Sequence, residues 1–160
     1  MSYTSNPNGA RDMAGQYLRQ QIEQASPIEQ VLMLYDGAIR FLQQAKLAIE
    51  AGDIQARCNA NRRAMEIVGY LSGLVDPTTG DEAARRLFGI YNGMLKRMLE
   101  IDFQNSAATC DDLMEGFRTL RVATAAALGQ QQSAKPGGAV VSAPMPDAEV
   151  LEKLRRNAVA

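Results

Sequence analysis

The stretch ASPIEQVLMLYDGAIRFL, residues 25–42, decides the fold because it holds a complete helix start followed by a wide apolar face. Ser26 precedes Pro27, and Glu29 follows two residues later, which is the pattern of a capping box with proline at the first helical position. The serine oxygen can accept a hydrogen bond from the Glu29 amide, and the glutamate can reach back to the Ser26 amide. The sequence therefore predicts a helix that begins at Pro27.

Apolar residues then recur at three- and four-residue steps up to about Ala51, and Gly52 ends the predicted helix. Asp53 can cap a second helix, whose pattern continues until Asp76-Pro77 stops it. A connection this short forces the two helices to pack antiparallel.

Two further helices follow from the same signals. Asp81 opens the third, whose pattern ends near Phe103, and Asn105 or Ser106 can cap a fourth that runs up to Gly129. No stretch alternates with period two over the length of a strand. The predicted fold class is therefore all-α, as an antiparallel up-down-up-down four-helix bundle.

The predicted bundle covers residues 26–128, and the two ends differ from it in composition. Residues 1–25 form a mostly polar N-terminal arm, and residues 129–160 form a tail with few large apolar groups. Such segments cannot bury enough apolar surface to fold alone, so we expect both to be disordered. Asp147 begins a stretch, DAEVLEKLRRNA, that could coil into three helical turns.

Composition excludes several classes of function. The 160 residues carry 17 basic and 18 acidic side chains, mixed along the chain, which does not suggest nucleic-acid binding. No apolar run approaches the roughly 20 residues of a membrane span, and no secretory signal is recognisable, so we expect a cytoplasmic protein without membrane insertion.

The sequence contains no histidine, which removes histidine-activated nucleophiles and most catalytic zinc sites. Cys58 and Cys110 lie far apart within helical patterns, so both are interpreted as small core residues. Asp36 beside Gly37 has no second carboxylate or phosphate-binding loop near it in sequence. We predict no enzyme activity, no cofactor and no metal.

Mid-helix glycines indicate either close helix packing or the floor of a groove, because each weakens its helix against alanine by up to about 1 kcal/mol. Gly37 is one such position, and the same interpretation extends to Gly69, Gly73, Gly89 and Gly93.

Several apolar residues lie beside the core stripes of the first three predicted helices: Leu34, Phe41, Ile67, Leu74, Ile90, Leu99 and Phe103, with Tyr70 next to them. One interpretation is that a bundle core uses a wide arc and these residues flank it. The other is that they form an exposed apolar groove for a partner segment. Tyr35 and Tyr91 leave the same two alternatives, a buried ring or a partner anchor.

A set of motifs suggests a family: Ala25-Ser26-Pro27, the run LMLYDGAI at 32–39, Phe41-Leu42, Tyr17 and Ile22 upstream, Leu74-Val75-Asp76, Leu87-Phe88 with Tyr91 and Met94, and Leu120-Arg121. Over about residues 17–128 this pattern resembles the FliS family of flagellar secretion chaperones, which bind flagellin.

The resemblance implies a cytoplasmic helical bundle that binds the disordered C-terminal segment of flagellin, prevents its premature polymerisation and delivers it to the flagellar export apparatus. It also implies that the arm carrying Tyr17 and Ile22 lies over part of the client site, and we hypothesise that the arm competes with the client. The expected partner-binding residues are Tyr17, Ile22, Leu34, Tyr35, Phe41, Ile67, Tyr70, Leu74, Ile90 and Tyr91. The alternative is a structural or regulatory bundle that forms a weak homodimer through the same apolar surface.

Overall fold

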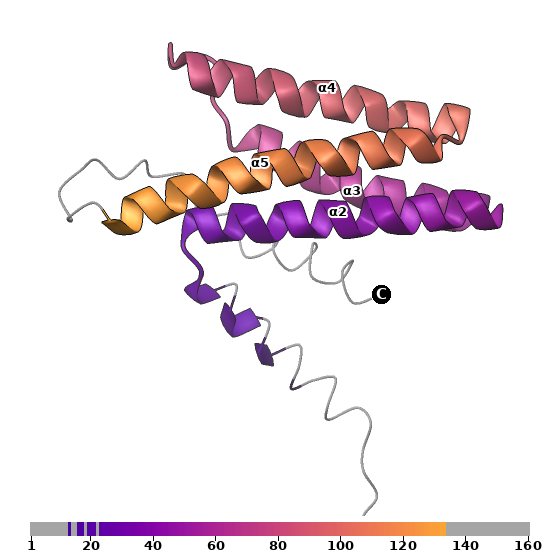
Figure 1. Cartoon of the computed structure of the whole chain (residues 1–160), viewed down its shortest axis with the longest axis horizontal. Helices are drawn as coiled ribbons and strands as arrows, with labels where there is room; N and C mark the ends of the chain where they lie inside the picture. The colour runs from indigo at the N-terminus through magenta and orange to yellow at the C-terminus, as the bar shows by residue number, and fades with distance from the viewer. Residues whose placement is uncertain (1–12, 14–15, 18, 22, 134–160) are drawn as a thin grey trace, which may run out of the picture.

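The computed structural model describes residues 13, 16–17, 19–21 and 23–133. All regular secondary structure in these residues is helical, which confirms the all-α prediction. The long helices are α2 (Pro27–Ala51), α3 (Ile54–Gly73), α4 (Glu82–Gln104) and α5 (Ala107–Ser133), as Figure 1 shows. Predictions for the first twelve residues and for 134–160 lie outside the described residues.

The start and end of α2 agree with the sequence prediction. The Ser26 amide donates to Glu29 Oε2 at 2.7 Å, and the Glu29 amide donates to Ser26 Oγ at 3.3 Å, so both halves of the capping box form. Gly52 ends the helix with φ of 72°, a left-handed conformation that glycine adopts without steric strain. Asp53 then caps α3 through its side chain.

The ends of α4 and α5 agree less closely. Asp81 caps α4, and Asn105 follows its last residue in the left-handed conformation, with φ of 53°. Ser106 Oγ accepts from the Thr109 amide at the start of α5. The predicted stop at Gly129 is wrong, because α5 continues to Ser133. An isolated glycine near a helix end lowers the stability of the helix without breaking it.

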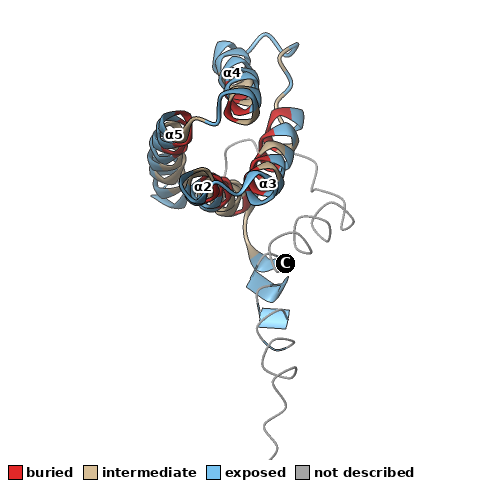
Figure 2. Cartoon of the chain, turned by 90° about the vertical axis from the view of Figure 1, so that its right-hand side faces the viewer, coloured by how far each residue is buried: buried red, intermediate tan, exposed pale blue. Residues whose placement is uncertain are grey.

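Seen from one end, the four helices surround a common core with their buried residues turned inward, and α4 lies opposite α2 (Figure 2). The core contains, in chain order, Tyr35, Ala38, Phe41, Leu42, Ala45, Ala60, Ala64, Ile67, Val68, Leu71, Tyr91, Met94, Met98, Ile101, Cys110, Leu113, Met114 and Phe117. These residues recur at helical spacing on each helix, so burial of one stripe per helix holds the fold together.

Ion pairs between α2 and α5 lie at the surface. Arg121 Nε is 2.6 Å from Asp36 Oδ1, and Lys46 Nζ is 2.9 Å from Asp111 Oδ1. The hydrogen bonds to these carboxylates raise the pKa of Arg121 and the pKa of Lys46. Exposed pairs of this kind add little stability, but they fix the register of the two helices. From the first pair to the second, the residue number rises along α2, from Asp36 to Lys46, and falls along α5, from Arg121 to Asp111.

A mostly buried polar cluster joins α3 to the C-terminal half of α4. Arg57 donates to Asn105 Oδ1 at 2.7 Å, and its Nε lies 3.4 Å from Asp102 Oδ1. The fully buried Asn61 donates to the Met98 carbonyl oxygen at 2.8 Å and to Asp102 Oδ2 at 3.0 Å. Here too the residue number rises along one helix, from Arg57 to Asn61 on α3, and falls along the other, from Asn105 to Met98.

Close helix packing explains one of the five mid-helix glycines. A Cβ on Gly37 would lie 3.2 Å from Ile67 Cδ1, so this glycine does let α3 approach α2 closely. Close packing is wrong for Gly69, Gly73, Gly89 and Gly93, because no atom of another described element lies within 4 Å of a Cβ built there, and a groove floor stays a prediction for them.

Candidate functional site

The ten residues expected to bind a partner fall into four groups. Tyr35, Phe41, Ile67 and Tyr91 are buried, Leu34, Tyr70 and Leu74 are half-buried, Ile90 and Tyr17 are 44% and 66% exposed, and Ile22 lies outside the described residues. The nine of these residues that the structure describes therefore do not form one continuous exposed surface.

Tyr35 and Tyr91 belong to the core. Each is 1% exposed, and their hydroxyl oxygens are 2.6 Å apart across the interior, which joins α2 to α4. The Tyr35 ring also contacts Phe117, with 6.0 Å between ring centroids. Burial raises the pKa of Tyr91, and its hydrogen bond to Tyr35 adds to the shift. The expectation that these tyrosines anchor a partner is corrected, because neither ring reaches the surface.

Phe41 and Ile67 also leave the expected groove. Phe41 is 4% exposed because two guanidinium groups cover its ring, with Arg40 Cζ and Arg63 Cζ at 5.4 and 5.6 Å from the ring centroid. Such cation–π contacts bury an aromatic face under long side chains that keep their charge in water. Ile67 packs against the backbone at Gly37. Both residues are core residues, as the wide-arc interpretation proposed.

Leu34, Tyr70 and Leu74 form what we call the α2–α3 seam. The two contacts of Phe41 with Arg63 and of Gly37 with Ile67 set the register of α2 against α3, and one turn farther on this register places Leu34 level with Tyr70. Leu74 follows α3 as its C-cap residue. All three side chains are half-buried, so each keeps part of its surface for a partner.

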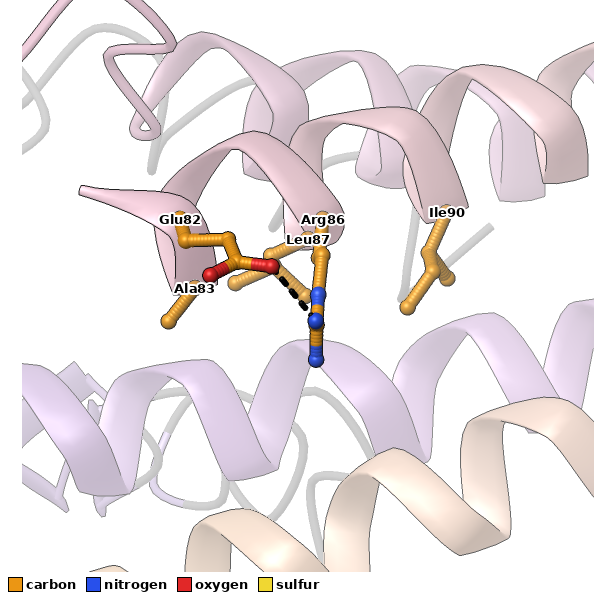
Figure 3. Close-up of a pocket in the computed structure, with 5 residues that line it drawn as sticks. All are labelled: Glu82, Ala83, Arg86, Leu87 and Ile90. Carbon is orange, nitrogen blue, oxygen red and sulfur yellow. Dashed lines mark hydrogen bonds and ion pairs between the residues drawn. The ribbon is translucent and has the colours of Figure 1, made fainter. Parts of the chain in front are cut away.

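A second apolar surface lies on the first turns of α4. Glu82, Ala83, Arg86, Leu87 and Ile90 line a hollow of about 440 Å³, which we call the α4 hollow. In Figure 3 their side chains point from α4 toward α2 and α5. All five come from one helix, so the hollow has no opposite wall that could enclose a small molecule. Its shape instead suits a segment of protein laid along it.

The hollow exists because α4 is attached to the rest of the bundle along only part of its length. Its polar contacts with other helices include the Tyr91 hydroxyl, which bonds to Tyr35, and Arg97, which pairs with Asp112 at 2.8 Å. Before Tyr91 the ion pair of Arg86 with Glu82 stays within α4. Figure 1 shows the start of α4 standing away from α5, while its end lies close to α5. Leu87 packs against the core but is only half-buried.

Other surplus apolar residues lie exposed elsewhere on the bundle. On α4, Leu99 is 48% exposed and Phe103 is 87% exposed, in agreement with the expectation of surplus surface on this helix. Ile54, the first residue of α3, is exposed as well. Sequence periodicity placed Phe103 beside the core stripe. It could not show that Ile54 lies before the buried part of α3.

The described residues offer little for catalysis. Cys110 is buried, and desolvation raises its pKa to about 11, so the thiol stays protonated and inert near neutral pH. Cys58, expected in the core, is half-buried. Asp36 has a structural role in its ion pair with Arg121. Within the residues described, no group of three or more His, Cys, Asp or Glu could hold a metal ion, and no helix is long and apolar enough to cross a membrane.

Comparison with known proteins gives the family. Residues 10–131 match the model of the family described as Flagellar protein FliS, a span that includes all four long helices up to the last turn of α5. The chain belongs to the FliS family. The match confirms the resemblance recognised in the sequence, and it contains all ten expected partner-binding residues.

Individual FliS relatives agree. A protein of Salmonella typhimurium named Flagellar secretion chaperone FliS is 35% identical over 91 residues, which are 56% of this chain and 67% of the relative. Its namesake in Vibrio cholerae is 29% identical over 103 residues, or 64% of this chain and 76% of the relative. The protein of the same name in Campylobacter jejuni is 31% identical over 90 residues, which are 56% of this chain and 70% of the relative.

Proposed function

We propose that this FliS-family chain is a cytoplasmic, non-enzymatic secretion chaperone that binds the disordered C-terminal segment of flagellin. In this role it prevents premature polymerisation of the client and delivers it to the flagellar export apparatus. The observation that carries the proposal is the match to the FliS family over residues 10–131 in a helical protein that keeps apolar side chains at its surface. The relatives' name, flagellar secretion chaperone, supports it.

The finer description of the fold belongs to the same proposal. An up-down-up-down antiparallel bundle is supported by the opposite residue numbering in the α2–α5 and α3–α4 contacts. It is also supported by the two-residue links between α2 and α3 and between α4 and α5. In this topology the start of α2, the end of α3 and the start of α4 meet at one end of the bundle, which we call the open end.

Both apolar surfaces lie near the open end, where we place the client. Leu34 is in the second turn of α2, Leu74 follows α3, and Ile90 is in the third turn of α4. A client that is disordered alone can follow such a curved path and bury apolar area at each surface. Its lost conformational entropy offsets part of that gain, so the complex is specific and can still be released to the export apparatus.

The arm gives the proposal a regulatory element. Tyr17 is exposed, and the helical residues described between 13 and 24 project away from the bundle in Figure 1. We retain the hypothesis that Tyr17 and Ile22 cover part of the client site in a fraction of free molecules. Client affinity then falls by the fraction of time that the site is covered. Deletion of residues 1–24 should raise affinity if this hypothesis holds and leave it unchanged if it fails.

A substitution in the seam tests the client site. Leu34→Asp should weaken binding of a flagellin C-terminal peptide by about 10- to 100-fold, since burying a leucine contributes about 1.5–3 kcal/mol. Leu47→Asp is the matched control, because Leu47 lies on the same helix and is already 54% exposed. Phe41 is unsuitable for this test, because it is a core residue.

Isothermal titration measures the affinity, and circular dichroism checks that both variants stay helical. Equal affinities for Leu34→Asp, Leu47→Asp and the unmodified protein would remove the seam from the client site. Failure of the unmodified protein to bind the peptide would reject the proposed client.

A bundle that self-associates is the second candidate function, and the exposure of Leu99 and Phe103 on α4 favours it. An exposed aromatic ring beside a leucine is typical of interfaces between proteins. Sedimentation equilibrium without peptide decides between the two functions. Dimers that disappear in Phe103→Asp, together with no peptide binding, would replace the chaperone proposal.

A further inference from the structure

The α4 hollow is an apolar surface that none of the described parts of the chain covers. Ala83 and Ile90 are exposed, and the half-buried Leu87 lies between them. Glu82 and Arg86 give its rim one acidic and one basic side chain, both largely exposed. A segment that covers this surface should therefore carry a short apolar stripe with charges of both signs beside it.

The described chain ends close to this surface. Arg97 pairs with Asp112, and a Cβ on Gly116 would lie 2.9 Å from Met94 Cε, so these two contacts set the register of α4 against α5. The same register places Leu87 level with Ala123. From Ala123 to Ser133 the helix adds about 15 Å, and α4 here stands farther from α5 than the about 10 Å of packed neighbours, so the end of α5 is more than about 18 Å from the hollow.

The sequence after Ser133 contains a segment that fits. Residues 147–158, DAEVLEKLRRNA, place Val150, Leu151, Leu154 and Ala158 within one narrow stripe of a helix. Acidic residues lie mainly in its first half and basic residues in its second half, which suits the helix dipole. As a helix it would be about 18 Å long, enough to cover the two turns from Ala83 to Ile90.

The spacer between the two also has the right length. Residues 134–146 separate α5 from the segment, and a flexible chain of 13 residues has a root-mean-square span of about 20 Å. Intramolecular binding is most favourable when this span matches the distance between the sites. A segment of 12 residues is marginal as an isolated helix, so its helix would form on docking.

We propose that residues 147–158 dock as an amphipathic helix on the α4 hollow of the same molecule. The apolar stripe covers Ala83, Leu87 and Ile90, and the flanking charges lie near Glu82 and Arg86. This inference goes beyond the chaperone function and does not depend on the identity of the client, because the tail covers the hollow in the free protein and leaves it when a client binds there. It assigns the tail, which lies beyond the FliS match, a role in covering apolar surface.

Paramagnetic broadening in the full-length protein tests the proposal. A nitroxide is attached at Asn157→Cys after Cys58→Ser, while Cys110 is buried and stays unlabelled. Amide signals of Ala83 and Ile90 should lose intensity. The amide of Phe103, at the far end of the same helix, should lose little.

Two matched variants in the tail complete the design, and neither can unfold the bundle core because both lie outside it. Leu154→Asp changes the apolar stripe and should restore the signals of Ala83 and Ile90. Arg156→Asp places the same side chain on the opposite face and should leave the broadening intact. Broadening that survives Leu154→Asp, or that never appears at the hollow, would overturn the proposal.

A mixed sample distinguishes the tail of the same molecule from that of a second copy. Isotope-labelled protein without nitroxide is combined with spin-labelled protein at natural isotope abundance. No broadening is expected, because docking is intramolecular. Broadening at Ile90 in this sample would assign the hollow to the tail of a second copy and overturn the intramolecular proposal.

Discussion

Replacing Tyr35 and Tyr91 by phenylalanine, singly and together, tests how the first half of α4 is connected to the core. The two hydroxyl oxygens are 2.6 Å apart, and both residues are 1% exposed. The hydrogen bond joins α4 to α2 across the interior. Removing one hydroxyl leaves the other in an apolar interior without its partner.

The expected magnitude follows from this burial. An unsatisfied buried hydroxyl costs about 1–3 kcal/mol, whereas replacing both partners by apolar groups of similar shape is nearly neutral. Each single variant should therefore lower the free energy of unfolding by about 1–3 kcal/mol. The double variant should lose less than the sum of the two, with a coupling energy of about 1–2 kcal/mol.

Urea denaturation followed by circular dichroism measures all four proteins of this double-mutant cycle. Near the size of this bundle, each kcal/mol lost should also lower the melting temperature by about 4 °C. Strictly additive losses in the double variant would refute the reasoning, because they would mean that the two hydroxyls do not depend on each other.

Three further predictions concern buried groups. Arg57→Ala should lower the free energy of unfolding by about 1–3 kcal/mol in urea denaturation, less than for a fully buried ion pair because Asp102 is 34% exposed. Cys58 should react with a thiol reagent in the native protein while Cys110 reacts only on unfolding, and equal native rates, followed by mass spectrometry, would contradict this. Stability should fall as the pH rises above about 9, because burial raises the pKa of Cys110 to about 11 and also raises the pKa of Tyr91, so only the unfolded chain loses these protons. Urea titrations from pH 8 to 10.5 measure this loss. For each group, the free energy of unfolding should fall by about 1.4 kcal/mol per pH unit in the range where the group is deprotonated in the unfolded chain and still protonated in the folded one. A free energy of unfolding that does not change with pH would contradict the prediction.

The helix boundaries were predictable because they depend on local chemistry. Ser26, Gly52 and Asp53 determine their own turns through hydrogen bonds within a few residues, and the structure contains each of these caps. Gly129 did not end α5, because a glycine outside the cap position only weakens a helix. The all-α class followed from the periodicity, which is equally local.

The candidate site was less predictable because it depends on contacts between helices. Phe41 lies on the flank of its own helix, but Arg63 from α3 helps to cover it, and no pattern within α2 can show that. The α4 hollow forms at the start of α4, where Leu87 packs against the core but stays half-buried and Ile90 is exposed, and the pattern of α4 alone cannot show that. The positions of Leu34 and Ile90 beside the core stripe were the sequence signal for surface that remains accessible.

Calorimetric titration of the unmodified protein with a flagellin C-terminal peptide at several temperatures tests the central claim most directly. If the apolar surface at the open end is covered by a disordered client, binding will be saturable at one peptide per chain. It will also show a large negative heat-capacity change and a gain in helical signal. No binding, or binding with a heat-capacity change near zero, would contradict the claim that client binding buries this surface.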